Sequence, residues 1–376
     1  MAYLEPTEEQ ETLRATLRSY FADRWPESEL RATADSATGH PEALWRSMAD
    51  DLGLHGLAIP EELGGGGFTQ VDQLVAFEEM GRALVAGPFL ASVGLAAPLL
   101  LALPDQANRR RLLPGIADGS RIATVAAVET PTAWDLERVG AEAVACGGQV
   151  TVTGEKLFVL DAQVADVLLV LARGEDGLCV VEVDPGDPAV SVVPMPTIDL
   201  TRRQARVVLT SAPGRVLASG PDALLAVHRM RDLASVALAA EQVGGAQRIL
   251  EMAVDHAQGR EQFGRPIGGF QAIKHLLADH LVAVESARAA LGHAASAVAA
   301  DREVGLAASV AQALCSEVYS AVAEAAIHVH GGIGFTWEHQ AHLYYKRAVS
   351  SEVLLGRPRE HRARIAAHLI DEREAS

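Results

Sequence analysis

One short polar and aromatic segment lies between two long apolar stretches. Residues 260–267 read Arg-Glu-Gln-Phe-Gly-Arg-Pro-Ile, and Phe270 and Gln271 follow. The glycine and proline predict a turn between two helices, with Arg260 near its tip. A guanidinium forms charged hydrogen bonds with phosphate oxygens, and aromatic rings pack on flat heterocycles. The segment is therefore suited to a phosphate-bearing ligand with a ring system; an ordinary helix–helix turn is the alternative.

A second segment, residues 330–338, reads His-Gly-Gly-Ile-Gly-Phe-Thr-Trp-Glu. Glycines such as Gly331 and Gly332 let the backbone come close to a ligand. Their N–H groups can then surround a pyrophosphate. Taken alone, this segment is also compatible with a simple turn at a helix end.

Other common sites are not expected. A GxGxxG sequence between a strand and a helix, a Walker A sequence, HExxH and GxSxG are all missing from the sequence. His328 and His330 are two positions apart, and His275 and His280 are five apart, so neither pair shares a helix face well. We expect no metal site.

Composition narrows the class of protein. The 376 residues are 49% hydrophobic and 22% charged, which is typical of a globular chain. The net charge of −17 disfavours nucleic acid or an anionic membrane as the main partner. The cysteines, Cys146, Cys179 and Cys315, are odd in number and far apart, so disulfides are not expected.

The sequence also predicts a cytoplasmic protein without a membrane span. The beginning of the chain lacks the basic start and apolar stretch of a signal peptide. An apolar run at residues 93–103 is interrupted by Pro98 and is too short to cross a bilayer.

The periodicity of apolar residues changes twice along the chain. Helical spacing dominates residues 1–120, short β-branched runs separated by Gly and Pro occupy residues 121–220, and long alanine-rich helical stretches fill residues 221–376. We therefore predict three domains with these boundaries. They are an N-terminal helical domain, a central β-barrel or sandwich, and a C-terminal four-helix bundle.

Together, the two glycine-containing segments resemble the signature segments of the acyl-CoA dehydrogenase family. The resemblance extends over essentially the whole chain and follows the same order. The further matches are residues 57–65 (Leu-Ala-Ile-Pro-Glu-Glu-Leu-Gly-Gly), 77–82 (Phe-Glu-Glu-Met-Gly-Arg), 154–156 (Gly-Glu-Lys), 165–166 (Ala-Asp) and 346–348 (Lys-Arg-Ala).

The resemblance implies a flavin-dependent acyl-CoA dehydrogenase with FAD as cofactor. In this family a glutamate removes the α-proton of an acyl-CoA thioester while the β-hydrogen leaves as hydride to the flavin. An electron-transferring flavoprotein usually reoxidises the flavin. FAD lies between the β domain and the bundle, and a neighbouring subunit completes its site. The resemblance therefore implies a dimer or tetramer, or a hetero-oligomer with a related subunit.

The resemblance also assigns cofactor residues. Arg260 would contact the FAD pyrophosphate from across the subunit interface, and Phe158 would face the flavin ring. The remaining predicted contacts are Gln262, Phe263, Gln271, His328, Gly331 and Gly332. The alternatives are that Phe158 and Phe263 are ordinary core residues and that Arg260 caps a helix end.

The catalytic base is where the sequence departs most from the family. The usual glutamate before a glycine is replaced by Leu355, next to Gly356, and the alternative position holds Ala234. Glu241 lies seven residues beyond Ala234, close to two helical turns, in an apolar stretch. An apolar environment raises the pKa of a carboxyl, which suits a base. We therefore predict Glu241 as the catalytic base. The alternative is that Glu241 is a buried structural residue paired with an arginine such as Arg229, Arg231 or Arg248. Glu352 is a weaker candidate for the base.

Further departures keep two other functions open. Leu160 replaces a frequent threonine near the flavin, and residues 129–134 read Glu-Thr-Pro-Thr-Ala-Trp in place of a glycine-containing loop. The chain could therefore be a non-catalytic or half-site partner subunit of a heteromeric acyl-CoA dehydrogenase, or a relative with other flavin chemistry. The sequence does not determine the acyl group.

Overall fold

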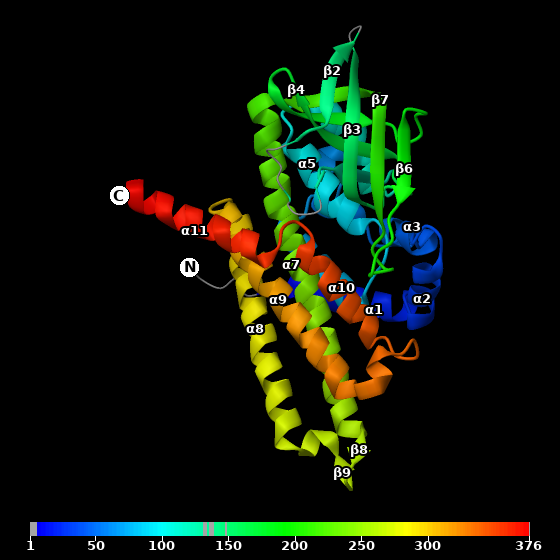
Figure 1. The fold of residues 1–376 in the computed structure, drawn as a ribbon, viewed down its shortest axis with the longest axis vertical. Coiled ribbons are helices and arrows are strands. Elements are labelled where there is room, and N and C mark those ends of the chain that lie inside the picture. The colour runs from blue at the N-terminus through cyan, green and yellow to red at the C-terminus, as the bar shows by residue number, and fades with distance from the viewer. Residues whose placement is uncertain (1–5, 131–133, 135–138, 147–148, 376) are drawn as a thin grey trace. The chain divides into compact units, whose positions relative to one another are not determined.

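A computed structural model describes residues 6–130, 134, 139–146 and 149–375. Contacts divide the chain into two compact units. The helical unit contains the described residues of Met1–Leu30, Gln70–Val85 and Ser235–Ser376, and the barrel unit contains Arg31–Thr69 and Ala86–Ala234. Each unit is considered by itself below (Figure 1).

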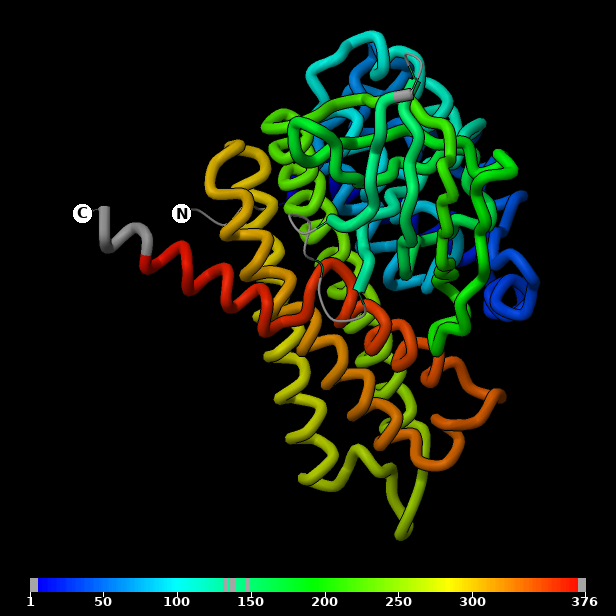
Figure 2. Tube along the Cα trace, turned by 45° about the horizontal axis from the view of Figure 1, so that its top comes forward, coloured from blue at the N-terminus to red at the C-terminus, as the bar shows by residue number. Residues whose placement is uncertain are grey.

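The barrel unit is built on a closed ring of strands. Strand β4 pairs with β2, β2 with β3, β3 with β7, β7 with β5, and β5 again with β4, while β1 and β6 add to β4 and β7 (Figure 2). The described strands are β1 (Ala123–Ala126), β2 (Glu142–Cys146), β3 (Gln149–Leu160), β4 (Val167–Gly174), β5 (Gly177–Val183), β6 (Val190–Pro194) and β7 (Gln204–Ser219). The predicted β-barrel is thus confirmed, since the strand pairing closes on itself; β1 and most of β4 are buried on both faces.

Short helices complete the barrel unit. The indole Nε1 of Trp45 donates a hydrogen bond of 2.8 Å to the carbonyl oxygen of Gly119, which ties α3 to the end of α6. The elements are α2 (Glu27–Asp35), α3 (Glu42–Asp50), η1 (Leu54–Gly56), η2 (Glu61–Leu63), η3 (Leu90–Ala96), α5 (Ala97–Ala102) and α6 (Gln106–Ala117).

The helical unit combines α1 and α4, from the N-terminal part of the chain, with the C-terminal helices. Helices α8, α10 and α11 all pack against α9, and α4 packs against both α1 and α8 (Figure 1). Their bounds are α1 (Glu8–Arg24), α4 (Gln70–Ala83), α7 (Gly220–Gly259, in this unit from Ser235), α8 (Gln271–Ala300), α9 (Val304–His330), η5 (Gly331–Phe335), α10 (Ala341–Val353) and α11 (Pro358–Ala375). The sequence-based division has three consecutive domains, whereas contacts group the chain into two units. The difference arises because α1 and α4 contribute to the same apolar core as the C-terminal helices.

Two glycines bring α4 and α7 into close contact. A Cβ atom on Gly81 would lie 1.9 Å from the carbonyl oxygen of Glu241, and one on Gly244 would lie 1.8 Å from that of Glu78. Any larger side chain would force the helices apart. The backbone around Glu241 is therefore fixed directly against α4.

One stretch of the described residues, Val304–Phe335, is long and apolar enough to cross a membrane. In its most apolar window, 67% of the residues are buried inside the protein, which is typical of a core helix. The sequence points to residues 93–103 as the apolar run to test for a membrane span, whereas the structure points to the helix that begins at Val304.

Candidate functional site

The segment after α7 forms the predicted turn. Strand β8 (Glu261–Gln262) pairs with β9 (Arg265–Pro266) in a small antiparallel hairpin. Its tip contains Phe263 at φ 55° and Gly264 at φ 76°, and Phe263 is 92% exposed. A fully exposed aromatic ring is not a core residue, so the alternative that placed Phe263 in the core does not hold within the described structure.

Arg260 stands at the base of this hairpin with its side chain exposed. Within the described residues, its guanidinium makes no hydrogen bond or ion pair, so it does not cap α7. Arg265, in contrast, stacks over the ring of Phe270 at 4.0 Å. Gln262 and Gln271 are also exposed. The hairpin thus offers an unpaired cation beside amide and aromatic groups, the donor set that a pyrophosphate-bearing cofactor needs.

The second predicted segment begins where α9 ends. Gly331 has φ 64°, and a Cβ atom built on Gly331 or Gly332 would meet no atom within 4 Å. Both glycines and His328 are exposed. The N–H of Gly331 already donates to the carbonyl oxygens of Ile327 and His328, so what this turn offers a ligand is open space beside its two glycines.

The barrel unit holds Phe158 in an unusual backbone conformation. Phe158 has φ 55°, and the pairing of β3 with β7 shifts register between Lys156 and Val159. Left-handed backbone costs free energy for a residue with a side chain, so the surrounding structure must hold it. The irregularity leaves the ring half-buried, as expected of an aromatic side chain that also faces a ligand.

A buried ion pair adjoins this irregularity. The Lys156 side chain is 0% exposed, and its Nζ lies 2.6 Å from Oε1 of Glu129. Glu129 also accepts hydrogen bonds from the backbone N–H groups of Gly140 (2.6 Å) and Ala141 (2.8 Å). Burial would raise the pKa of Glu129, but the bonds from Lys156 and the backbone lower it overall. Within the loop at residues 129–134, positions 131–133 lie outside the described residues.

The predicted base, Glu241, takes part in a buried ion pair in the helical unit. Its Oε1 lies 2.7 Å from Nη1 of Arg347, and the two side chains are 7% and 2% exposed. Arg347 also donates to the carbonyl oxygen of Val85 at 3.3 Å. The partner is not one of the arginines expected from the sequence: Arg231 pairs with Asp232 and Arg248 with Glu251.

The two positions where the family usually carries its base are apolar and buried. Leu355 is 2% exposed and has φ 62°, and Gly356 follows at φ 110°. Ala234, on α7 in the barrel unit, is 0% exposed. Glu352, the weaker candidate, accepts a hydrogen bond of 2.7 Å from the hydroxyl of Ser320.

A polar cleft of about 370 Å³ also lies within the helical unit. Its arginines are already paired with its glutamates, which makes a structural network the simplest account. The pairs are Arg14 with Glu78 and Glu79, Arg18 with Glu79, Arg82 with Glu251, and Arg288 with Glu78.

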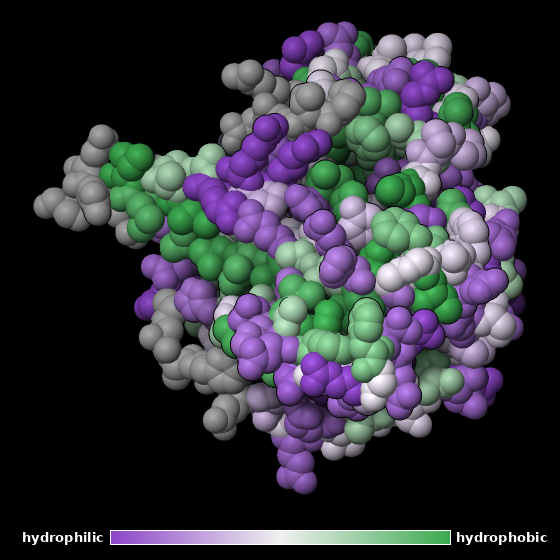
Figure 3. All heavy atoms as spheres, turned by 60° about the horizontal axis from the view of Figure 1, so that its bottom comes forward, coloured by the Kyte–Doolittle hydropathy of each residue, from purple (hydrophilic) through white to green (hydrophobic). Residues whose placement is uncertain are grey.

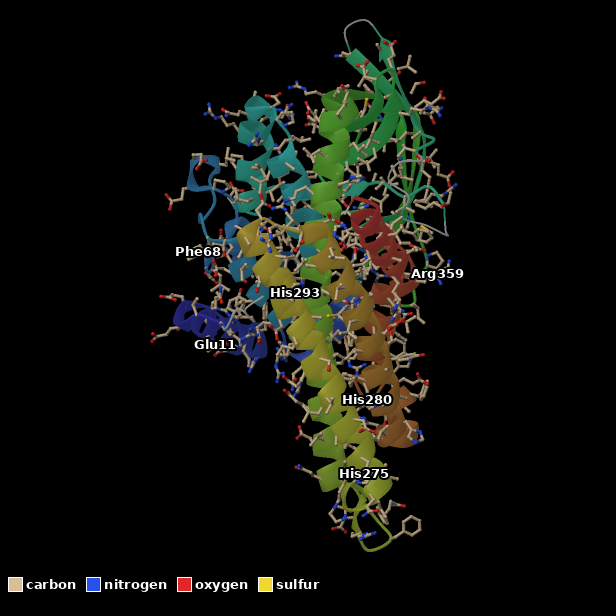
Figure 4. The ribbon with its side chains drawn as sticks, turned by 90° about the vertical axis from the view of Figure 1, so that its left-hand side faces the viewer. Glu11, Phe68, His275, His280, His293 and Arg359 are labelled. Carbon is tan, nitrogen blue, oxygen red and sulfur yellow. The ribbon has the colours of Figure 1, made fainter. Side chains whose placement is uncertain are left out.

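Three features were missed as functional candidates by sequence reasoning. Arg347 and Lys156 were noted only as parts of motifs, and their partners lie 106 and 27 residues away. The stacked rings of His256, His330 and His339 were not grouped, because the three side chains are far apart in the sequence. No metal cluster is found among the described histidines, cysteines and acids, and Figure 4 shows His275, His280 and His293 along α8.

Family models match most of the chain. The acyl-CoA dehydrogenase N-terminal domain matches residues 7–120, and the acyl-CoA dehydrogenase C-terminal domain matches residues 229–370. The chain belongs to the acyl-CoA dehydrogenase family. Among its relatives, the acyl-CoA dehydrogenase IpdE2 of Mycolicibacterium smegmatis is 36% identical, over 97% of this chain and 100% of that protein.

Solved structures of the acyl-CoA dehydrogenase family show the same fold. A variant of the Tcur3481–Tcur3483 steroid acyl-CoA dehydrogenase is 34% identical, with a TM-score of 0.89 over 98% of this chain and 99% of that one. The ChsE4–ChsE5 complex of Mycobacterium tuberculosis is 30% identical, with a TM-score of 0.90 over 98% and 99%. The predicted helical domain, barrel and helical C-terminal domain are therefore confirmed.

Proposed function

We propose that this chain is a subunit of an FAD-dependent acyl-CoA dehydrogenase that forms the α,β double bond of an acyl-CoA thioester. The observation that carries the proposal is the family match over residues 7–120 and 229–370, together with the exposed guanidinium of Arg260 and the open space beside Gly331 and Gly332. When bound, FAD would accept the hydride that leaves the β-carbon.

The chain's own residues would hold the cofactor in distinct ways. Arg260 would bind a phosphate through charged hydrogen bonds, with Gln262, Phe263 and Gln271 around it on the hairpin. Gly331 and Gly332 would let the diphosphate come close to the backbone, with His328 beside them. Phe158 would present its ring face from the barrel unit.

The identity of the carboxylate that removes the α-proton distinguishes a complete dehydrogenase from a half-site subunit. Glu241 is the base predicted from the sequence, and this assignment stays a prediction. Its ion pair with Arg347 stabilises the negative charge and engages the group that would accept the proton. This observation favours the second candidate, a half-site subunit that works beside a related chain carrying the base.

The same proposal covers the oligomeric assembly and the electron acceptor that reoxidises the flavin. The similar ChsE4–ChsE5 structure is a complex, and it supports a hetero-oligomer here. Apolar side chains on α11 and α8, including Leu369, Ile370 and Val282 at 50%, 57% and 66% exposure, are suited to subunit contacts (Figure 3 shows those along the projecting α11). We further propose a cytoplasmic enzyme reoxidised by an electron-transferring flavoprotein.

Cofactor content and anaerobic reduction of the purified chain test the proposal. The chain should copurify with FAD, alone or with a related subunit, and acyl-CoA should bleach the flavin without oxygen. Sedimentation should show an oligomer. A colourless protein that binds no FAD under either condition would exclude the proposed function, whereas bleaching only with a partner would support the half-site subunit.

A further inference from the structure

Three imidazole rings pack against one another in the helical unit, tilted by 33° and 47°, and this group is called the stack below. The ring centroids of His256 and His330 are 4.5 Å apart, and those of His330 and His339 are 4.3 Å apart. The rings come from α7, from the last residue of α9 and from the turn before α10, whose ends lie side by side in both ribbon and tube views (Figures 1 and 2). Distant parts of the sequence thus build one cluster.

The stack lies directly beside both predicted pyrophosphate contacts. Arg260 directly follows α7, and its backbone N–H donates a hydrogen bond of 2.8 Å to the carbonyl oxygen of His256, so the two residues are neighbours. His330 immediately precedes Gly331, whose backbone is open to a ligand. An anion bound by Arg260 and the Gly331 turn would therefore lie within electrostatic reach of these rings.

The hydrogen bonds of His330 and His339 limit where a proton can be added. Nδ1 of His330 lies 2.7 Å from the carbonyl oxygen of Ala326, so Nδ1 carries a hydrogen and donates it, which leaves Nε2 to take up a proton. Nδ1 of His339 accepts from the backbone N–H of Ala341 at 3.1 Å and cannot be protonated without losing that bond. No group of His, Cys, Asp or Glu in the described part of the chain could hold a metal ion.

Among the described residues, no negative charge compensates a proton on His256 or His330. Burial, then His330 and Arg260, lower the pKa of His256, and burial lowers the pKa of His330. No carboxylate acts on either ring in the described part of the chain. The charged or titratable groups nearest to the rings along these elements include the exposed Asp255, His328 and Glu338. Lys346 and His342 both lie against Trp337.

We propose that the His256–His330–His339 stack lies beside the diphosphate site and takes up a proton when the cofactor binds. Binding of the cofactor's diphosphate would then place a proton on His256 or His330. This inference rests on the proposed function, and it adds that cofactor binding is coupled to pH. A nearby anion favours the protonated imidazole, so the bound form holds more protons than the free form. By reciprocity, protonation strengthens anion binding.

The sign of the pH dependence follows from this coupling. The diphosphate diester of FAD keeps its charge near neutral pH, so the change in protonation belongs to the protein. Affinity for FAD should rise as the pH falls from about 8 to about 6, by up to about tenfold per pH unit for one coupled proton. It should level off once the free stack is itself protonated.

The test measures FAD binding to the full chain, with its partner subunit if one copurifies, across this pH range. Calorimetry in two buffers of different ionisation enthalpy gives the proton uptake directly. The probes are FAD and ADP-ribose, which carries the same diphosphate diester without the flavin. We expect proton uptake with the parent and a flattened pH dependence with His256→Gln and His330→Gln, measured as separate variants so that a folding defect in one does not decide the result.

His293→Gln on α8 is the matched control, since His293 belongs to a different helix (Figure 4). It should keep the parent's pH dependence. Parent-like proton uptake in both stack variants, or absence of uptake in the parent, would overturn the inference. Binding of ADP-ribose with proton uptake but without FAD binding would support the stack and refute the proposed flavin function, so the two failures are distinguishable.

Discussion

Glu241 and Arg347 form a buried ion pair across 106 residues of sequence, with 2.7 Å between Oε1 and Nη1. Arg347 also donates to the carbonyl oxygen of Val85, so it links α10 with α7 and the end of α4. Removing one partner of a buried pair leaves an uncompensated charge in a low-dielectric interior. The contact therefore gives Glu241 a structural role that is separable from catalysis.

We expect Glu241→Gln to lower the free energy of unfolding by about 3–5 kcal/mol, because it leaves the Arg347 charge without its counterion. Denaturant unfolding measures this loss. The double variant Glu241→Leu with Arg347→Met, which removes both charges, should recover much of the stability.

The same variant tests Glu241 as the base. If Glu241 accepts the α-proton, flavin bleaching by acyl-CoA should slow by about 100- to 10,000-fold in Glu241→Gln. Bleaching at the parent rate in the folded variant would remove Glu241 from the mechanism.

Arg260→Ala should weaken FAD binding while leaving the fold intact. The guanidinium is exposed and makes no bond within the described residues, whereas a charged hydrogen bond to phosphate contributes about 1.5–3 kcal/mol, or about 10- to 100-fold in affinity. Fluorescence titration gives the affinity. Arg359→Ala, on the outside of α11, serves as the control (Figure 4). Unchanged FAD affinity in Arg260→Ala would show that this arginine does not contact the cofactor.

Lys156→Met should destabilise the barrel unit and disturb the environment of Phe158. The substitution leaves Glu129 without its buried cation, at a cost of about 3–5 kcal/mol, and Glu129→Gln in the same chain should offset part of the loss. Flavin circular dichroism should change with Lys156→Met if the pair positions Phe158. A purely structural pair would change stability alone.

The Glu129–Lys156 pair also gives a pH dependence of stability. The pKa of Glu129 is lowered below its ordinary value of 4.5, so its contribution is present above pH 4.5 and is lost as the pH falls further. Acid unfolding of Glu129→Gln should therefore show a weaker dependence on pH below about 4.5 than the parent.

The order of helices and strands could be predicted from the sequence because hydrophobic periodicity is local. The change from helix to strand after residue 120 and back after residue 220 matches the end of α6 at Ala117 and the start of α7 at Gly220. The turn at Arg260 and the glycine segment at Gly331 were likewise predictable, since each motif is contiguous.

The partners of buried charges could not be predicted, because they depend on tertiary packing. Arg347 was expected neither as the counterion of Glu241 nor as a core residue, and His256 could not be related to His330 from spacing. Left-handed backbone at Phe158 and Leu355 is equally invisible in the sequence, since neither residue type favours it. Local patterns thus predicted the two candidate cofactor segments, but not the charge network of the buried ion pairs.

The last prediction concerns Leu355, which is buried in left-handed backbone where the family usually carries its base. If the chain is a half-site subunit, its own site lacks a proton acceptor, and Leu355→Glu should supply one. Leu355→Gln is the matched control, because it has nearly the same size and polarity but cannot act as a base at neutral pH. Both variants bury a polar group, so a common loss of stability should cancel from their comparison.

Anaerobic bleaching by a panel of acyl-CoA thioesters measures the difference between these two variants. We expect Leu355→Glu to bleach the flavin about 100- to 10,000-fold faster than Leu355→Gln, the range that a positioned general base contributes. Equal rates in the two variants, with FAD bound to both, would show that a carboxylate at this position does not reach the α-carbon. The base would then have to come from Glu241, Glu352 or a partner subunit, and the bleaching of Glu241→Gln described above separates the first from the others.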